Sequence, residues 1–212
     1  MIVKPGFDTD TYLKVQTSEI LGRVGKFEKL YLEFGGKLCY DMHAARVLPG
    51  YRQSSKIELL KKLGDIDIVY CVSAKDIAKG RVRRDFGLTY DNQTLKDIQD
   101  IGDMGLNVTA VVITRYDRQE AAQIFRKRLE NFGMKVYIHD EIPGYPNDLE
   151  KVVKGYDKQP HVETKKKLVI VTESAGILGR WLSASARYIT SARRGRRQVS
   201  PSSRPSLSGT SP

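Results

Sequence analysis

IDIVYCVSA, residues 66–74, is the stretch that decides the fold. It is a near-continuous apolar run, which is typical of a strand covered on both faces. Further strand-like runs occur at residues 29–34, 106–114, 134–140 and 166–172. Strands buried on both faces belong to parallel sheets that lie between helices, so this stretch predicts an α/β protein.

Helical patterns separate these strands. Residues 8–25, 54–63, 92–104 and 117–132 show helical spacing of apolar residues, and a short helix is expected near 147–154. Asp8 or Thr9, Asn92 and Asp117 are the expected N-caps. The alternation predicts a Rossmann-like, mostly parallel sheet with helices on both faces, formed by a domain of residues 1–172. No G-x-G-x-x-G follows the first strand, so the sequence does not support a dinucleotide cofactor.

The charge is concentrated at the C-terminus. The net charge is +11, but residues 174–212 hold seven Arg and no Lys, Asp or Glu, which leaves a net charge of +4 for the rest. Residues 173–212 are rich in Arg, Ser and Pro, and this composition predicts a disordered tail. We therefore expect nucleic acid to bind only non-specifically, through that tail.

The sequence excludes a transmembrane helix, because it has no run of 18 apolar residues. Cys39 and Cys71 are too few for a disulfide framework and lie in apolar surroundings, so we expect buried free thiols. A cytoplasmic protein that needs no membrane fits both observations, and it could form an oligomer. No pattern of Cys and His indicates a metal site.

Residues 31–51, YLEFGGKLCYDMHAARVLPGY, hold the densest group of candidate site residues. Gly35, Gly36 and Lys37 follow a strand, where they form either a solvated turn or a cradle for an anion. Asp41 could orient the imidazole of His43, and Arg46, three residues further, could bind a carboxylate or phosphate. The alternative is a capped helix start with a structural ion pair.

Two further candidate groups follow later strands. Arg83, Asp85 and Tyr90 belong to a basic and aromatic loop, which is either solvated or a lid that binds phosphate. Thr114 and Arg115 end a strand at the edge where open α/β sheets bind ligands. His139 also ends a strand, and a structural role is expected for it.

Several long motifs in this chain resemble those of one bacterial family. They are YLEFGGKLCYDMHAARVLPGY, VRRDFGLTYD, VVITRYDRQEAAQIFRKRLENFGMKVYIH and IPGYP. The chain is identified as a member of the domain-of-unknown-function family eighteen-forty-six, also called uncharacterised protein family three-seventy-one, over residues 6–172. The resemblance implies that this chain is less than half of a full-length member. After the last strand the family has a glycine-rich loop with Gly-Lys, which implies nucleotide binding in full-length relatives.

The chain departs from the family after the last strand. Gly179, Arg180 and Trp181 can be encoded by GGA AGA TGG, which reads Lys-Met in another frame, and that frame continues into the family's segment. We therefore expect residues from about 173 to be an out-of-frame translation, which DNA sequencing would test.

The resulting functional hypothesis is an N-terminal fragment that binds a small anionic or nucleotide-like ligand at the carboxyl ends of its strands. The fragment itself is expected to be inactive. Two alternatives stay open: an RNA- or protein-binding module that uses the basic loop and the tail, and a structural protein without a ligand.

Overall fold

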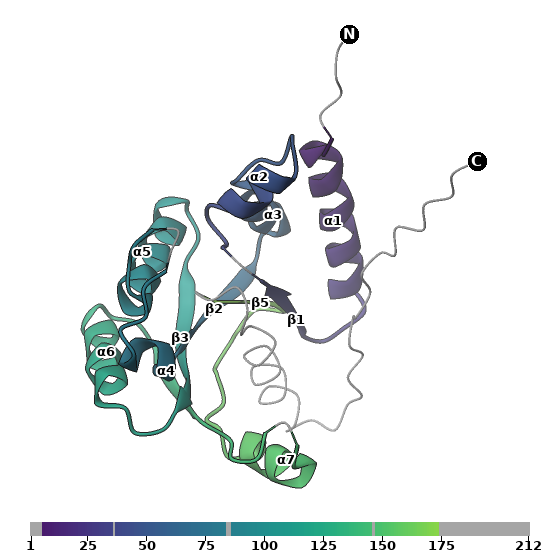
Figure 1. Cartoon of the computed structure of the whole chain (residues 1–212). Helices are drawn as coiled ribbons and strands as arrows, with labels where there is room; N and C mark the ends of the chain where they lie inside the picture. Colours follow the sequence, from purple (N-terminus) through teal and green to yellow (C-terminus); the bar gives the residue numbers. More distant parts are fainter. Residues whose placement is uncertain (1–5, 36, 84–85, 146, 174–212) are drawn as a thin grey trace.

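The computed structural model describes residues 6–35, 37–83, 86–145 and 147–173 (Figure 1). In this part of the chain, five parallel strands form one sheet in the order β1-β5-β2-β3-β4. They are β1 (Leu30–Phe34), β2 (Ile66–Ser73), β3 (Val108–Tyr116), β4 (Val136–Asp140) and β5 (Leu168–Glu173). The predicted parallel α/β fold is confirmed. The last strand of the sequence, β5, lies between β1 and β2 and pairs with both.

Helices connect the strands. They are α1 (Thr9–Val24), α2 (Met42–Val47), α3 (Ser55–Leu63), α4 (Ala74–Ala78), α5 (Tyr90–Asp103), α6 (Glu120–Asn131) and α7 (Leu149–Asp157). The short helix α4 follows β2 directly and had not been predicted. Its N-cap is Ser73, whose hydroxyl accepts a hydrogen bond from the Asp76 backbone N–H.

Alternate residues of each strand enter two separate apolar layers. Ile68, Tyr70 and Val72 of β2 pack with residues of α1, α3, α5 and α6 in the larger core. Val69 and Cys71 point to the opposite face and form a smaller cluster with their neighbours in β3 and β5. Successive side chains of a strand point to opposite faces of the sheet. Because both sets are apolar and buried here, the strand is covered on both sides.

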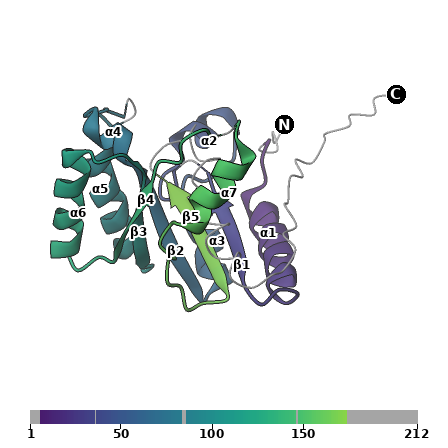
Figure 2. The same ribbon diagram turned by 90° about the horizontal axis from the view of Figure 1, so that it is seen from below.

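Helix α7 lies on the opposite side of the sheet from α1 and α3, as both views show (Figures 1 and 2). The chain reverses its direction across the sheet between β4 and β5, and right-handed crossovers then place α7 on the second face. Val152 and Tyr156 of α7 pack on Ile142. A Cβ atom at Gly155 would lie 2.5 Å from Ile142 Cγ2, so only glycine permits this close approach.

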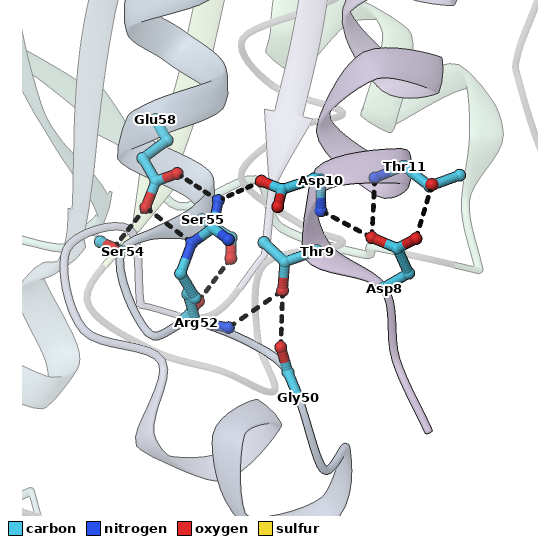
Figure 3. A network of polar contacts seen from close by, with 9 residues as sticks. All are labelled: Asp8, Thr9, Asp10, Thr11, Gly50, Arg52, Ser54, Ser55 and Glu58. Atoms are coloured by element: carbon cyan, nitrogen blue, oxygen red, sulfur yellow. Dashed lines mark hydrogen bonds and ion pairs between the residues drawn. The ribbon is translucent and has the colours of Figure 1, made fainter. Parts of the chain in front are cut away.

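The start of α1 is fixed to the segment that precedes α3 (Figure 3). Asp8 caps α1, as predicted, and accepts hydrogen bonds of 3.0 Å from the backbone N–H groups of Asp10 and Thr11. Arg52 forms ion pairs of 2.8 Å with Asp10 and with Glu58 of α3. These contacts fix the segment between α2 and α3 to the start of α1. They therefore fix part of the connection between β1 and α3.

The N-caps predicted for two other helices are wrong. Thr89, not Asn92, is the N-cap of α5, and the side-chain amide of Asn92 donates a 2.9 Å hydrogen bond to the Thr89 hydroxyl. Gln119, not Asp117, precedes α6. In both helices the N-cap is another polar residue within three positions of the predicted one.

Candidate functional site

Most of the predicted site residues follow the carboxyl ends of the strands, at the edge of the sheet where α2 and α4 lie (Figure 2). Gly35 and Lys37 follow β1, Arg83 lies in the loop between α4 and α5, and Thr114 and Arg115 belong to the end of β3. Gly36 and Asp85 lie outside the described residues. A parallel sheet brings these connections to one edge because all its strands end there.

Lys56 of α3 holds the segment that follows β1. Its ammonium donates hydrogen bonds to the carbonyl oxygens of Gly35 at 2.8 Å and Lys37 at 3.1 Å, and forms a 2.8 Å ion pair with Asp41. No motif in the sequence had indicated Lys56 as a site residue. Both side chains of the ion pair are largely buried. We therefore expect the pair to stabilise the fold, which an exposed surface pair would do only weakly.

Asp41 has a structural role. Its carboxylate accepts a 2.9 Å hydrogen bond from the Ala44 backbone N–H and caps α2, in addition to the ion pair with Lys56. Burial raises the pKa of Asp41, but the hydrogen bonds from Lys56 and Ala44 outweigh this effect and the pKa lies below its ordinary value. The carboxylate thus binds Ala44 and Lys56 and not the imidazole of His43, contrary to the expected orientation.

His43 and Arg46 lie on α2, where they have the predicted separation of one helical turn. Both side chains are exposed, and α2 buries none of its residues. The segment is therefore a capped helix start with an ion pair at Asp41, which corresponds to the structural alternative for this motif.

Lys37 points inward. Its ammonium lies 3.1 Å from the centroid of the Phe86 ring, in a cation–π contact. Phe86 belongs to the loop between α4 and α5, which is folded back on itself by an antiparallel bridge between Val82 and Thr89. The basic loop after β2 and the glycine turn after β1 are therefore in contact.

A buried polar network lies below this contact. The hydroxyl of Tyr70 on β2 donates a short hydrogen bond to Asp97 of α5, and the amide of Gln93 donates another of 2.7 Å. Burial raises the pKa of Asp97, while Arg83 and Lys37 act in the opposite direction through their charges. Two cations from separate loops therefore lie close to one buried carboxyl group.

The side chains of Tyr90 and Thr114 contact other parts of the fold and do not point into an open site. Tyr90 is half-buried, packs against the larger core and forms the first turn of α5. Thr114 is buried, and its hydroxyl donates a 3.2 Å hydrogen bond to the Val72 carbonyl oxygen across the sheet. Its backbone ends β3 at the predicted edge, but its side chain bonds to the neighbouring strand.

Arg115, the residue before the last one of β3, has a left-handed backbone conformation, with φ of 54°. A non-glycine residue rarely adopts this conformation, and it is found preferentially where function or tight packing requires it. Its guanidinium lies 3.5 Å from Glu141, which also pairs with Lys75 of α4. Glu141 thus connects the ends of β3 and β4 with the helix that follows β2.

Glu173 is the last residue of β5, so the prediction that placed it in the disordered tail of residues 173–212 is wrong at this residue. It pairs in register with Cys71 of β2, and its side chain is 7 % exposed. Burial, followed by the charge of Glu33, raises its pKa to about 7, and Arg83 opposes this shift. The central strand of the sheet therefore ends in a buried acid whose charged neighbours are the cation Arg83 and the carboxyl groups of Glu33 and Asp76.

A groove with a volume of about 490 Å³ lies beside this edge, between α1 and β1. Gly35 and Lys56 contribute to its lining, together with Tyr12 and Phe34. Lys37, Arg83 and Arg115 do not line it, so the groove does not contain these cations.

Within the described residues, no group of three or more His, Cys, Asp and Glu side chains could hold a metal ion. Cys39 and Cys71 are free and buried, as predicted. Burial raises the pKa of Cys39 to about 12, so this thiol is not activated. None of the helices in the described ranges has the length and apolar character needed to cross a membrane.

Comparisons with known proteins give the family. The family described as "Domain of unknown function DUF1846, N-terminal" matches residues 5–198. A UPF0371 protein of Clostridium tetani (strain Massachusetts / E88) is 48% identical over 173 residues, which cover 80% of this chain and 34% of the relative. A UPF0371 protein of Clostridium botulinum (strain ATCC 19397 / Type A) is 49% identical over 170 residues, or 79% of this chain and 34% of the relative. This chain spans about a third of the length of these relatives.

Proposed function

The chain belongs to the DUF1846 family, and we propose that its N-terminal α/β domain binds a small anionic ligand, of the phosphate-bearing class, at the carboxyl edge of the sheet. The observation that carries this proposal is that the charges of Lys37 and Arg83, which come from separate loops, both act on the buried carboxyl group of Asp97. The two cations come from the connections after β1 and after β2, which lie on either side of β5.

The architecture of the edge supports the proposal. In open parallel sheets, ligands bind outside the carboxyl ends of the strands, where loops of different origin meet. Three of these connections carry a cation here, namely Lys37, Arg83 and Arg115. The guanidinium group binds phosphate through paired hydrogen bonds, and the ammonium group binds it as a point charge.

The second support is that Lys37 is held in place before a ligand binds. Lys56 fixes the backbone around Gly35 and Lys37, and the Phe86 ring fixes the Lys37 ammonium. Preorganisation of this kind reduces the entropy that a ligand must otherwise offset when it orders a site.

A ligand titration tests the proposal. Sulfate, inorganic phosphate, ATP and ribose 5-phosphate would each be titrated calorimetrically into the 212-residue protein and into the variants Arg83→Gln and Lys37→Met. The wild type is expected to bind at least one of them. Each variant should lose about 10-fold to 100-fold in affinity, because one charge-assisted hydrogen bond contributes about 1.5–3 kcal/mol.

The matched control is Lys61→Met. Lys61 is exposed in the last turn of α3, at the opposite edge of the sheet, and its loss should leave the affinity unchanged. Thermal unfolding of all variants checks that they are folded. A wild type that binds none of the four anions, or an equal loss of affinity in Lys61→Met, contradicts the proposal.

A further inference from the structure

We propose that the segment of residues 40–48, which contains α2, is a docking surface, and that the C-terminal part of a full-length family member binds to it. The surface consists of the exposed apolar side chains of Tyr40, Met42, Val47 and Leu48, which we call the α2 surface. This inference goes beyond the proposed anion site, because it concerns a contact between two parts of the protein and needs no ligand.

Exposed apolar side chains gather in this segment more than elsewhere. Twelve large apolar side chains are exposed in the described ranges, and four of them form the α2 surface, with exposed fractions of 39–54 %. No other stretch of nine residues in those ranges holds more than two. Single exposed apolar residues are normal on a protein surface, whereas a group of them indicates an interaction site.

Both ends of the segment are fixed to the rest of the domain. Asp41 caps α2 and forms the 2.8 Å ion pair with Lys56. At the other end, the Pro49 carbonyl oxygen accepts a 2.9 Å hydrogen bond from the backbone N–H of Phe7, whose ring lies 5.3 Å from the ring of Tyr51. These contacts hold in place a helix that buries none of its own residues. A surface held in this way loses little conformational entropy when a partner binds.

The α2 surface lies at the edge of the sheet where the polypeptide leaves the last strand. β1 and β5 are adjacent parallel strands, with Phe34 in register with Thr172. The connection after β1 leads into α2, so α2 and the end of β5 lie at the same carboxyl edge (Figure 2). A part of the protein that follows β5 therefore starts at the edge that carries the α2 surface.

Full-length relatives contain such a part. The family model that matches this chain describes an N-terminal domain, and the matched residues make up 34% of each of the two clostridial relatives. About two thirds of each relative therefore lies outside the matched region. Two parts joined in one chain meet at a high effective concentration, so a contact of modest area is sufficient to hold them together.

The residue types of the α2 surface indicate the chemistry of its partner. Tyrosine, methionine and arginine are enriched at the centres of protein interfaces, and Arg46 is exposed beside Tyr40 and Met42. We expect an apolar patch on the C-terminal part, with a carboxylate opposite Arg46, because a guanidinium group pairs with a carboxylate through two hydrogen bonds.

Hydroxyl-radical footprinting, read by mass spectrometry, tests the docking because it reports the exposure of side chains. It would compare the 212-residue protein with the full-length UPF0371 protein of Clostridium tetani, with labelling rates corrected for the reactivity of each residue type. Residues 40–48 should be labelled readily in the 212-residue protein, and the aligned residues of the relative several-fold more slowly. The position of Phe132, another exposed apolar residue, should be labelled equally in both. Equal labelling of the aligned segments would overturn the proposal.

A charge placed on the α2 surface gives a second test. Val47→Asp should leave the melting temperature of the 212-residue protein nearly unchanged, because the position is exposed. The same substitution at the aligned position of the full-length relative should lower its melting temperature by several degrees, since it buries an unpaired charge. Phe132→Asp is the matched control and should have the same small effect in both proteins. An equal effect of Val47→Asp in the two proteins contradicts the docking.

A second copy of the chain is the alternative occupant of the α2 surface. Light scattering of both proteins, with and without the substitution at Val47, distinguishes the two. The proposal requires the molar mass of both proteins to be unaffected by the substitution. A dimer of either protein that Val47→Asp dissociates would assign the surface to a second copy and overturn the proposal. Loss of anion binding in the variants of the proposed site has no bearing on these results, so the two proposals fail independently.

Discussion

The ammonium of Lys56 and the carboxylate of Asp41 form a 2.8 Å ion pair that closes the connection after β1 onto α3. Because both side chains are largely buried, Lys56→Met leaves the Asp41 carboxylate without its cation and the carbonyl oxygens of Gly35 and Lys37 without a donor. We expect the free energy of unfolding to fall by about 1–3 kcal/mol, measured by urea denaturation. Lys62→Met, at an exposed position of the same helix, should change it by less than about 0.5 kcal/mol. Equal effects of the two substitutions would contradict a structural role of the ion pair.

Tyr70 and Asp97 should be energetically coupled. Tyr70→Phe removes the hydroxyl that donates to the buried Asp97 carboxylate, and we expect a loss of about 1–3 kcal/mol in the free energy of unfolding. A double-mutant cycle with Asp97→Asn should give a coupling energy of about 1 kcal/mol or more, since the two groups are in contact. Tyr40→Phe, at an exposed tyrosine, serves as the control. Additive effects of Tyr70→Phe and Asp97→Asn would show that the hydrogen bond contributes nothing.

His139 should make the protein less stable in acid. Its Nε2 atom donates a 3.1 Å hydrogen bond to the Pro160 carbonyl oxygen, and burial lowers its pKa from 6.5 to about 4. The unfolded chain therefore binds a proton at a higher pH than the folded protein does. Stability is fully present above pH 6.5 and is lost as the pH falls from 6.5 towards 4, by about 3 kcal/mol in total.

Denaturant unfolding at several pH values tests this prediction. His139→Gln does not titrate, so the decrease between pH 6.5 and 4 should be smaller than in the wild type. His43→Gln, at an exposed position of α2, should leave the decrease unchanged. If His139→Gln and the wild type lose the same stability over this interval, other groups cause the loss.

Glu173 should destabilise the free protein above neutral pH. Its pKa is raised from 4.5 to about 7, so the folded state binds its proton more tightly than the unfolded state does. The stabilising contribution is fully present below pH 4.5 and is lost as the pH rises through about 7. Glu173→Gln should therefore have a higher melting temperature than the wild type at pH 8, and the difference should shrink at pH 5. A constant difference at both pH values would be inconsistent with a titrating Glu173.

Arg118 gives a backbone prediction. It has a φ of 60°, a conformation that glycine adopts without cost. Arg118→Gly should be more stable than Arg118→Ala by about 1 kcal/mol, because an L-residue with a Cβ atom is disfavoured there. At Lys127, an exposed position in α6, the same pair of substitutions should have the opposite order, with Ala more stable than Gly by about 1 kcal/mol.

The order of helices and strands could be predicted because local periodicity decides it. The apolar run around Val69 has no exposed face, and Asp8 is the first strong capping residue before an apolar helical stripe. The cap of α5 could not be predicted in the same way, since Thr89 and Asn92 are both good capping residues and tertiary packing selects Thr89.

The site could be predicted less completely than the fold. The edge of the sheet that carries the candidate site could be predicted, because Lys37, Arg83 and Arg115 lie at or after the ends of predicted strands. Lys56 carries no local signal, because its partner Asp41 lies 15 residues away, and the contact of Asp97 with Tyr70, 27 residues away, also forms only in the folded chain. A weak signal existed for Asp97, which lies four residues after the buried Gln93 on α5, because polar residues on the buried face of a helix need partners.

The position of β5 has a consequence for the order in which the domain can fold. β1 and β2 do not pair with each other, since β5 lies between them, and the contact of Thr172 with Phe34 joins residues that are 138 positions apart. Contacts of such long range slow folding, because a large loop must close before they form. On the ribosome, β1 can join the sheet formed by β2, β3 and β4 only after β5 has been synthesised. β5 also joins the two strands whose connections carry Lys37 and Arg83, so the candidate site can be assembled only when the sheet is complete.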